Sequence, residues 1–234
     1  MNNNYFDYLE ELFHDWRYDH PKIMYGIVRA MKPDVVVEVG TYRGYTACFL
    51  AKALQENKKG HLYCIDNFSL HEHVEKYGDP KQHLIDNFTK AGVLDVVTLL
   101  EGNSDEVQWP DKVDFSYVDG WHSYKICKRD FMMAWGRGAK VIGFDDVRNC
   151  VGTKLFLKEL RENPLPNCDI MEFSADNGLA LVSRRPENFP LNFSQELPDN
   201  PGTDITAMTT EEQKEYLAGV SKVTGIDYSK LFLK

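Results

Sequence analysis

Five short apolar segments of the kind that form buried parallel β-strands alternate along the chain with stretches long enough for helices. They are rich in β-branched residues and almost free of charge inside: VVVEVG at 35–40, LYCID at 62–66, VVTLLEG at 96–102, FSYVDG at 115–120 and AKVIGFDD at 139–146. Such alternation predicts βαβ units, in which a parallel sheet lies between helices on both faces. The expected fold is therefore α/β, Rossmann-like and doubly wound.

The second half of the chain predicts how the sheet ends. After a helix expected around Thr153–Arg161, the segment CDIMEFSADNGLALVSR places two apolar runs about Asp176-Asn177-Gly178. This pattern indicates a hairpin, which would add one antiparallel strand to a mostly parallel sheet. We expect residues 1–185 to form one domain. Residues 186–201 contain four prolines and predict an irregular connection, and the extension 186–234, with a helix near Thr210–Val223, is expected to pack on the same domain.

The N-terminal segment has the pattern of an amphipathic helix. Apolar residues recur at helical spacing, with acids on the other side: Tyr5, Phe6, Leu9, Leu12, Phe13 and Trp16. Such a helix either packs on the core or covers a site as a lid, and the pattern alone leaves both roles open.

Composition narrows the class of function. With 234 residues and 43% hydrophobic residues the chain can bury a sizeable core, and the 36 acids against 27 Lys and Arg leave a net charge of -9, opposite to the basic surface of a nucleic-acid binder. No apolar run approaches the ~20 residues of a membrane span, so we expect neither a nucleic-acid nor a membrane partner, and a cytoplasmic location. The five cysteines form no Cys-x-x-Cys pair and are expected to be reduced core residues.

Acids and glycines follow the predicted strands. Ligands of open parallel sheets bind beyond the carboxyl ends of the strands, so these residues are candidates for a site. They are Glu38 to Gly44, Asp66, Gly102 to Asp105, Asp119 and Asp145-Asp146. Gly40 and Gly44 allow a sharp turn and the approach of a ligand to the backbone at a helix N-terminus. The loop is neither the Gly-x-Gly-x-x-Gly of dinucleotide sites nor a phosphate loop.

The series Glu-x-Gly-x-x-x-Gly, followed about two dozen residues later by an acid, resembles the class I S-adenosylmethionine-dependent methyltransferases. The resemblance extends over Val35 to Arg184 and implies a seven-stranded sheet and S-adenosylmethionine as cofactor. It implies that the loop of Gly40, Thr41, Tyr42 and Gly44 lies beside the methionine part and that Glu38 holds its amino group. Asp66 would accept both ribose hydroxyls, which suits the two oxygens of a carboxylate, and Ser104 and Asp105 would lie by the adenine.

The segment DGWHSY and the acid pair resemble the metal-dependent branch, which includes catechol O-methyltransferase and the macrocin-type sugar methyltransferases. This likeness implies that Asp119, Asp145 and Asp146 bind Mg²⁺ or another divalent cation, with Asp119 also beside the cofactor. Three clustered carboxylates would repel one another without a cation, although Asp119-Gly120 alone would also suit a simple turn. His122 is the candidate base, with a metal ligand or a plain loop residue as alternatives. Trp121 either flanks the acceptor or belongs to the core.

The function expected from this resemblance is S-adenosylmethionine-dependent, divalent-metal-dependent O-methylation of a small-molecule hydroxyl. The alternative is a catalytically silent adenosyl- or cation-binding module that acts in an assembly. The sequence identifies neither the acceptor nor the oligomeric state, for which a homo-oligomer is one option. One polar stretch contains three histidines and indicates a solvated insert rather than a zinc site: His71, His73 and His83. Gly152 is expected just before the helix that follows the acid pair.

Overall fold

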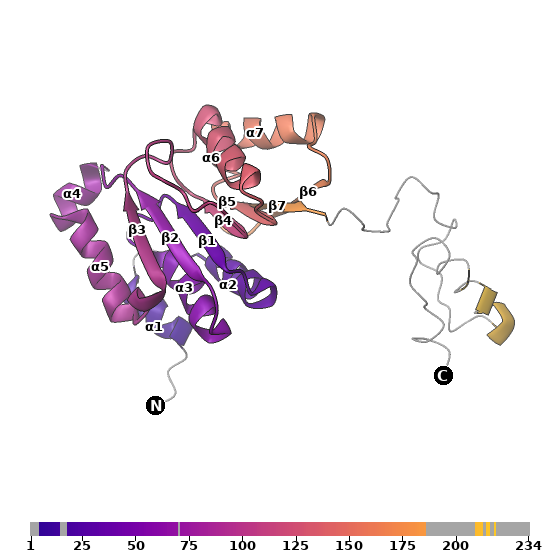
Figure 1. The fold of residues 1–234 in the computed structure, drawn as a ribbon, viewed down its shortest axis with the longest axis horizontal. Coiled ribbons are helices and arrows are strands. Elements are labelled where there is room, and N and C mark those ends of the chain that lie inside the picture. The colour runs from indigo at the N-terminus through magenta and orange to yellow at the C-terminus, as the bar shows by residue number, and fades with distance from the viewer. Residues whose placement is uncertain are drawn as a thin grey trace. The chain divides into compact units, whose positions relative to one another are not determined.

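The computed structural model describes residues 5–14, 18–69 and 71–185, apart from the side chains of 71–73, together with 209–212, 214, 215 and 218. Seven strands form one sheet in this part of the chain (Figure 1). The helix expected near Thr210–Val223 is helical at 210–212, 214, 215 and 218, and its remainder lies outside the described residues. Because residues 186–208 also lie outside them, the packing of the extension on the domain stays a prediction.

The strand order is β3-β2-β1-β4-β5-β7-β6. The strands are β1 (Val35–Val39), β2 (His61–Asp66), β3 (Val97–Glu101), β4 (Phe115–Val118), β5 (Val141–Phe144), β6 (Cys168–Phe173) and β7 (Leu179–Arg184). The first five pair in parallel, and β7 runs antiparallel to both β5 and β6. The predicted doubly wound, mostly parallel sheet with an antiparallel strand from a C-terminal hairpin is thus confirmed.

The order of strands reverses between β1 and β4. The chain leaves β1 toward one face of the sheet and leaves β4 toward the other, so the loops that follow these two strands diverge and open a crevice between them. Register brings the two strand ends level, with Val39 opposite Val118. The polar residues that follow both strands therefore face the same crevice.

Two hydrophobic cores lie on the two faces of the sheet. Buried side chains of α1 (Tyr5–Leu12), α2 (His20–Met31), α3 (Tyr45–Asn57) and α5 (Pro80–Ala91) pack on one face. Those of α6 (Tyr124–Gly136) and α7 (Val151–Glu162) pack on the other (Figure 1). The short helix α4 (His71–Tyr77) and a 3₁₀ turn, η1 (Leu94–Val96), complete the elements.

The N-terminal region differs from the single helix that the apolar spacing predicts. The first helix ends at Leu12, Trp16 lies outside the described residues, and a second helix, α2, follows. Leu9 and Phe13 are fully buried, and the Tyr5 hydroxyl donates to the carbonyl of Ala91. The first helix therefore has the core-packing role.

The polar insert after β2 contains α4 and the beginning of α5. Local signals explain α5: Asp79 caps it by accepting from the Gln82 amide at 3.0 Å, Pro80 occupies the first turn, and Gly92 ends it in the left-handed conformation. Among the described residues, no helix combines the length and the apolar character needed to cross a membrane.

Candidate active site

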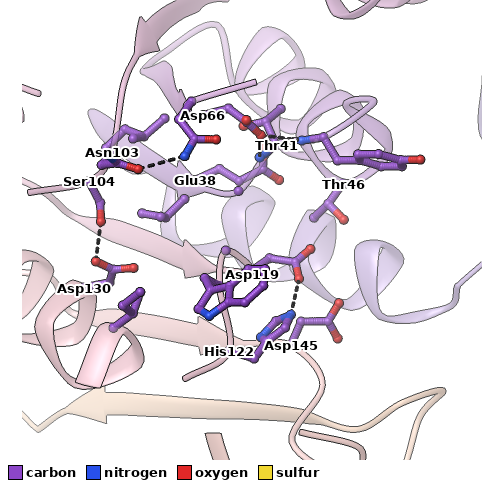
Figure 2. A pocket seen from close by; sticks show the side chains of 18 of the residues that line it. Glu38, Thr41, Thr46, Asp66, Asn103, Ser104, Asp119, His122, Asp130 and Asp145 are labelled. Carbon is purple, nitrogen blue, oxygen red and sulfur yellow. Dashed lines mark hydrogen bonds and ion pairs between the residues drawn. The ribbon is translucent and has the colours of Figure 1, made fainter. Parts of the chain in front are cut away.

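A cavity of about 530 Å³ opens at the carboxyl ends of β1, β2, β4 and β5 (Figure 2). Most of the residues selected from the sequence line it: Glu38, Gly40, Thr41, Tyr42, Asp66, Ser104, Asp119, His122, Asp145 and Asp146. Gly44 and Asp105 do not. The topology explains the convergence, because the carboxyl ends of neighbouring parallel strands meet at one edge of the sheet.

The glycines of the first loop are required by the packing of the chain on itself. A Cβ on Gly40 would lie 2.3 Å from the Asp119 carbonyl oxygen and 2.5 Å from Gly120 Cα. One on Gly44 would lie 2.6 Å from Leu84 Cδ1 and 2.7 Å from Phe88 Cε1. Both glycines also have positive φ angles. Gly44 is therefore a packing residue of α3 against α5, and Gly40 brings the loops after β1 and β4 into contact at the cavity.

Asp66 fixes the conformation of the same loop. Its Oδ2 accepts hydrogen bonds from the backbone amides of Thr41 at 2.9 Å and Tyr42 at 2.8 Å, and its Oδ1 accepts one from Phe68 at 2.7 Å. A carboxylate has about four lone-pair sites, so these three bonds leave about one for a ligand.

Glu38 is a buried acid at the end of β1, with a side chain that is only 1% exposed. Burial, with a further contribution from the charge of Asp66, raises the pKa of the Glu38 carboxyl to about 8. Its Oε2 lies 3.8 Å from the Cys64 thiol. An acid with this pKa is mostly neutral at pH 7, and a cationic ligand group beside it would favour its ionised form.

Ser104 belongs to a polar cluster with two residues of α6 that sequence reasoning missed. Its hydroxyl donates to Asp130 Oδ1 at 2.6 Å and accepts from Arg129 at 2.6 Å (Figure 2). Arg129 lines the cavity and also pairs with Asp105 at 2.6 Å, whereas Asp105 is not part of the lining. Asp130 lines the cavity, and its Oδ2 is buried without a hydrogen-bond partner among the described residues. No local signal distinguishes Lys-Arg-Asp at 128–130 from the charged surface of an ordinary helix.

The three acids expected to hold a metal lie at the other end of the cavity. Burial, followed by the charges of Asp145, Glu38 and Asp146, holds the pKa of Asp119 well above its usual range. Burial also raises the pKa of Asp145. Asp145 Oδ1 accepts from the backbone amide of Asp146 at 2.8 Å, and Asp146 has a left-handed φ of 55°.

The acids do not all converge on one point. Within the described part of the chain, the one group of His, Cys, Asp or Glu ligand atoms that all lie within 4.8 Å of one another comprises His122, Asp146 and Cys150. His122 Nε2 lies 3.3 Å from Asp146 Oδ2 and 3.7 Å from Asp119 Oδ1. The Cys150 thiol lies 3.7 Å from the same Asp146 oxygen. Cys150 is thus half-buried beside the site, whereas the expectation for all five cysteines was a place in the core.

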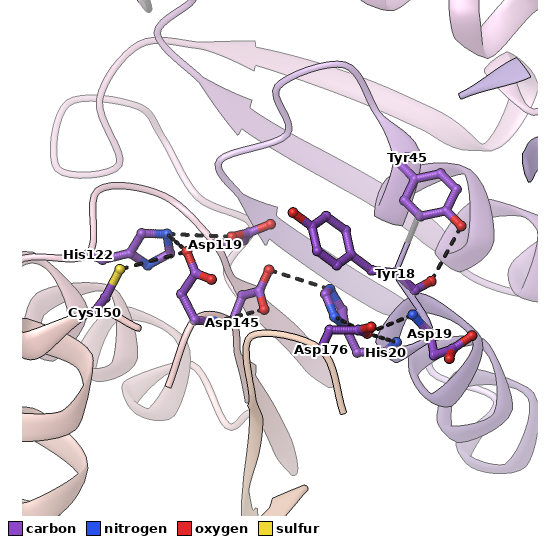
Figure 3. A network of polar contacts seen from close by, with 10 residues as sticks. Tyr18, Asp19, His20, Tyr45, Asp119, His122, Asp145, Cys150 and Asp176 are labelled. Carbon is purple, nitrogen blue, oxygen red and sulfur yellow. Dashed lines mark hydrogen bonds and ion pairs between the residues drawn. The ribbon is translucent and has the colours of Figure 1, made fainter. Parts of the chain in front are cut away.

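Asp145 is instead directed toward His20, another residue that the sequence did not single out (Figure 3). His20 is 1% exposed, and its Nε2 lies 3.4 Å from Asp145 Oδ2. Its Nδ1 lies 3.2 Å from Asp176 Oδ2, which also accepts from the backbone amides of Asp19 and His20. The turn of the β6–β7 hairpin therefore holds the start of α2, and α2 in turn holds Asp145.

Two further expectations concern aromatic residues and the histidine-rich insert. Trp121 is 72% exposed and lines the cavity, so the core alternative for this residue is wrong. His83 stacks on Tyr77 with ring centroids 4.2 Å apart, and burial lowers its pKa. The side chains of His71 and His73 lie outside the described residues.

Comparisons with known proteins agree with this architecture. Residues 37–147 match a family described as "Methyltransferase domain", and no curated protein is significantly similar to the sequence. The O-methyltransferase TomG of Streptomyces achromogenes, solved with S-adenosylmethionine, is 15% identical with a TM-score of 0.59 over 80% of this chain and 92% of its own. An O-methyltransferase from Bacillus cereus, solved with the demethylated product, is 15% identical with a TM-score of 0.59 over 79% and 92%.

A third structure, a Podospora anserina methyltransferase bound to the same product, is 17% identical with a TM-score of 0.57 over 78% of this chain and 86% of its own. At these identities the structural likeness shows the fold alone. The likeness confirms the predicted fold, and the match over residues 37–147 agrees with the resemblance to class I S-adenosylmethionine-dependent methyltransferases.

Proposed function

We propose that the protein catalyses the S-adenosylmethionine-dependent O-methylation of a small-molecule hydroxyl and that it requires a divalent cation. The observation that supports this proposal is that the residues expected to hold the cofactor and those expected to hold the cation line one cavity. Glu38, Asp66 and Ser104 lie at the ends of β1, β2 and β3, and the acids with His122 lie at the ends of β4 and β5. Two of the compared structures are O-methyltransferases bound to the cofactor or to its product, which supports the reaction class.

The residues present fit the cofactor. Glu38 is a buried acid, and burial disfavours its ionised form unless a cation lies beside it. The amino group of the methionine part would be such a cation. Asp130 Oδ2 is a buried acceptor that has no partner in the part of the chain that the structure describes, and it suits an amino group of the adenine. When bound, S-adenosylmethionine supplies an electrophilic methyl group on a sulfonium.

The donor set also fits a hard divalent ion. Asp119, Asp145 and Asp146 offer carboxylate oxygens, and the pKa of Asp119 is raised because these acids are buried near one another. A cation there would relieve this repulsion and, when bound, would lower the pKa of the acceptor hydroxyl. His122 Nε2 would take the proton of that hydroxyl, since the ring faces the cavity between Asp119 and Asp146. Trp121 would shield the acceptor from water.

A transfer assay with labelled S-adenosylmethionine and a library of hydroxyl compounds tests the proposal, with Mg²⁺ present or removed by chelation. We expect label in at least one acceptor, and only with the cation. Binding of the demethylated product, measured by calorimetry, without transfer to any acceptor would favour the silent binding module. Absence of both would refute the proposal.

A further inference from the structure

We infer that His122, Asp146 and Cys150 form a binding site for a thiophilic divalent ion of the Zn²⁺ type, overlapping the site proposed for Mg²⁺. The geometry of the three side chains supports binding of such an ion. The effect of that ion on methyl transfer rests on the proposed function.

The two distances from Asp146 Oδ2 to the other ligand atoms match the edges of a tetrahedral zinc site. Zn–N and Zn–O bonds of about 2.0–2.1 Å and a Zn–S bond of about 2.3 Å, at tetrahedral angles, separate the N and O ligands by about 3.3 Å and the S and O ligands by about 3.6 Å. Here His122 Nε2 and Asp146 Oδ2 are 3.3 Å apart, and Cys150 Sγ and the same oxygen are 3.7 Å apart. Three protein ligands would leave one position for water.

The backbone holds these residues together through tight contacts. Asp146 adopts a left-handed φ of 55°, and its carbonyl accepts from the amides of Asn149 at 3.2 Å and Cys150 at 2.9 Å. A Cβ on Gly152 would lie 2.3 Å from the carbonyl oxygen of His122. Glycine at 152 therefore lets the first turn of α7 approach the loop after β4, which brings Cys150 to His122.

The ligand types decide which ion is preferred. Mg²⁺ demands hard oxygen ligands and near-octahedral geometry, whereas one imidazole, one carboxylate and one thiolate suit Zn²⁺ and related transition metals. A second observation points to an absent partner, because Asp146 Oδ1 is buried and makes no hydrogen bond within the described residues. Binding converts the Cys150 thiol to a thiolate joined to the metal and releases one proton to the solvent.

Occupation of this site would inhibit methyl transfer. A metal on His122 Nε2 uses the lone pair that the base needs, and a metal on Asp146 competes for an oxygen ligand of Mg²⁺. Zn²⁺ should therefore inhibit, and added Mg²⁺ should reduce the inhibition. The four other cysteines are buried and take no part.

Cobalt reports the thiolate directly. The full chain, stripped of metals, is titrated with Co²⁺ and followed by absorption, in parallel with Cys150→Ser and, as matched control, Cys168→Ala. We expect a thiolate-to-cobalt charge-transfer band that saturates at one equivalent in the unmodified chain and in the control and is missing in Cys150→Ser. In calorimetry, Cys150→Ser should weaken Zn²⁺ binding by at least about 100-fold and leave Mg²⁺ binding within about twofold. Loss of a residue that only supports a metal ligand weakens binding by about 10- to 100-fold, so a larger loss indicates a direct ligand.

Proton release provides a second measurement that does not depend on a variant. Zn²⁺ binding to the unmodified chain should release about one proton more than its binding to Cys150→Ser. A Co²⁺ complex without the charge-transfer band, or equal Zn²⁺ affinity in the unmodified chain and Cys150→Ser, would overturn the inference even if Mg²⁺-dependent methylation is observed. A thiolate band in a chain that methylates nothing would support the metal site and count against the proposed function.

Discussion

Replacing Glu38 by Gln should stabilise the protein at neutral and mildly alkaline pH. Folding raises the pKa of the Glu38 carboxyl from 4.5 to about 8, mainly through burial. Between these values the native state binds more protons than the unfolded state, so the free energy of unfolding falls as pH rises. Below pH 4.5 the carboxyl is protonated in both states and Glu38 does not lower the free energy of unfolding. That free energy falls as pH rises from 4.5 and levels off above pH 8, where the carboxyl is ionised in both states.

The magnitude follows from the same shift. Each pKa unit corresponds to about 1.4 kcal/mol, so Glu38 should remove roughly 4 kcal/mol of stability between pH 4.5 and pH 7.5. Glu38→Gln has no such titration, and its neutral amide keeps an oxygen that the Cys64 thiol, 3.8 Å away, can approach. The variant should therefore become more stable than the unmodified chain, by up to about that amount at pH 7.5.

Urea unfolding at several pH values between 5 and 8 measures this difference. The curve of unfolding free energy against pH should fall more steeply for the unmodified chain than for Glu38→Gln. Glu162→Gln, on the exposed face of α7, should behave as the unmodified chain. Parallel curves for the unmodified chain and Glu38→Gln would refute the burial argument. The proposed function adds that Glu38→Gln should bind the demethylated product more weakly despite its greater stability, since it cannot pair with an ammonium group.

Further variants examine the other parts of the site. Gly40→Ala should destabilise the fold by more than the 1–2 kcal/mol of a left-handed alanine, because its Cβ would meet the backbone of Asp119, and an unchanged urea midpoint would contradict this contact. Asp66→Asn should weaken product binding roughly 10- to 100-fold by loosening the loop of Thr41 and Tyr42, whereas Asp95→Asn in η1 should not, and calorimetry compares the two. Asp119→Asn should abolish Mg²⁺-dependent turnover and keep product binding; turnover that survives exhaustive chelation would exclude a metal requirement. His122→Ala should lose about 10²–10⁴-fold in kcat, with His61→Ala at the amino end of β2 as control, and near-normal turnover would show that His122 is not the base.

The sequence alone determined the strands and the residues at their ends. Apolar, β-branched runs between helix-length segments are local signals, and parallel pairing then brings their carboxyl ends to one edge of the sheet. For this reason the sequence predicts that Glu38, Asp66, Ser104, Asp119 and the acid pair lie together beyond the carboxyl ends of the strands. The Asp-Asn-Gly turn of the hairpin was an equally local signal.

Only the tertiary structure decided which side chains meet. His20 reaches Asp145 because the β6–β7 turn holds the start of α2. Cys150 reaches His122 because glycine at 152 lets the first turn of α7 approach the loop after β4. The Asp66 carboxylate accepts three hydrogen bonds from nearby backbone amides, and the spacing of residues in the sequence could not reveal these bonds. Periodicity specifies the face and the end of an element, whereas a contact of 3 to 4 Å depends on loop conformations and on the packing of segments that are distant in the chain.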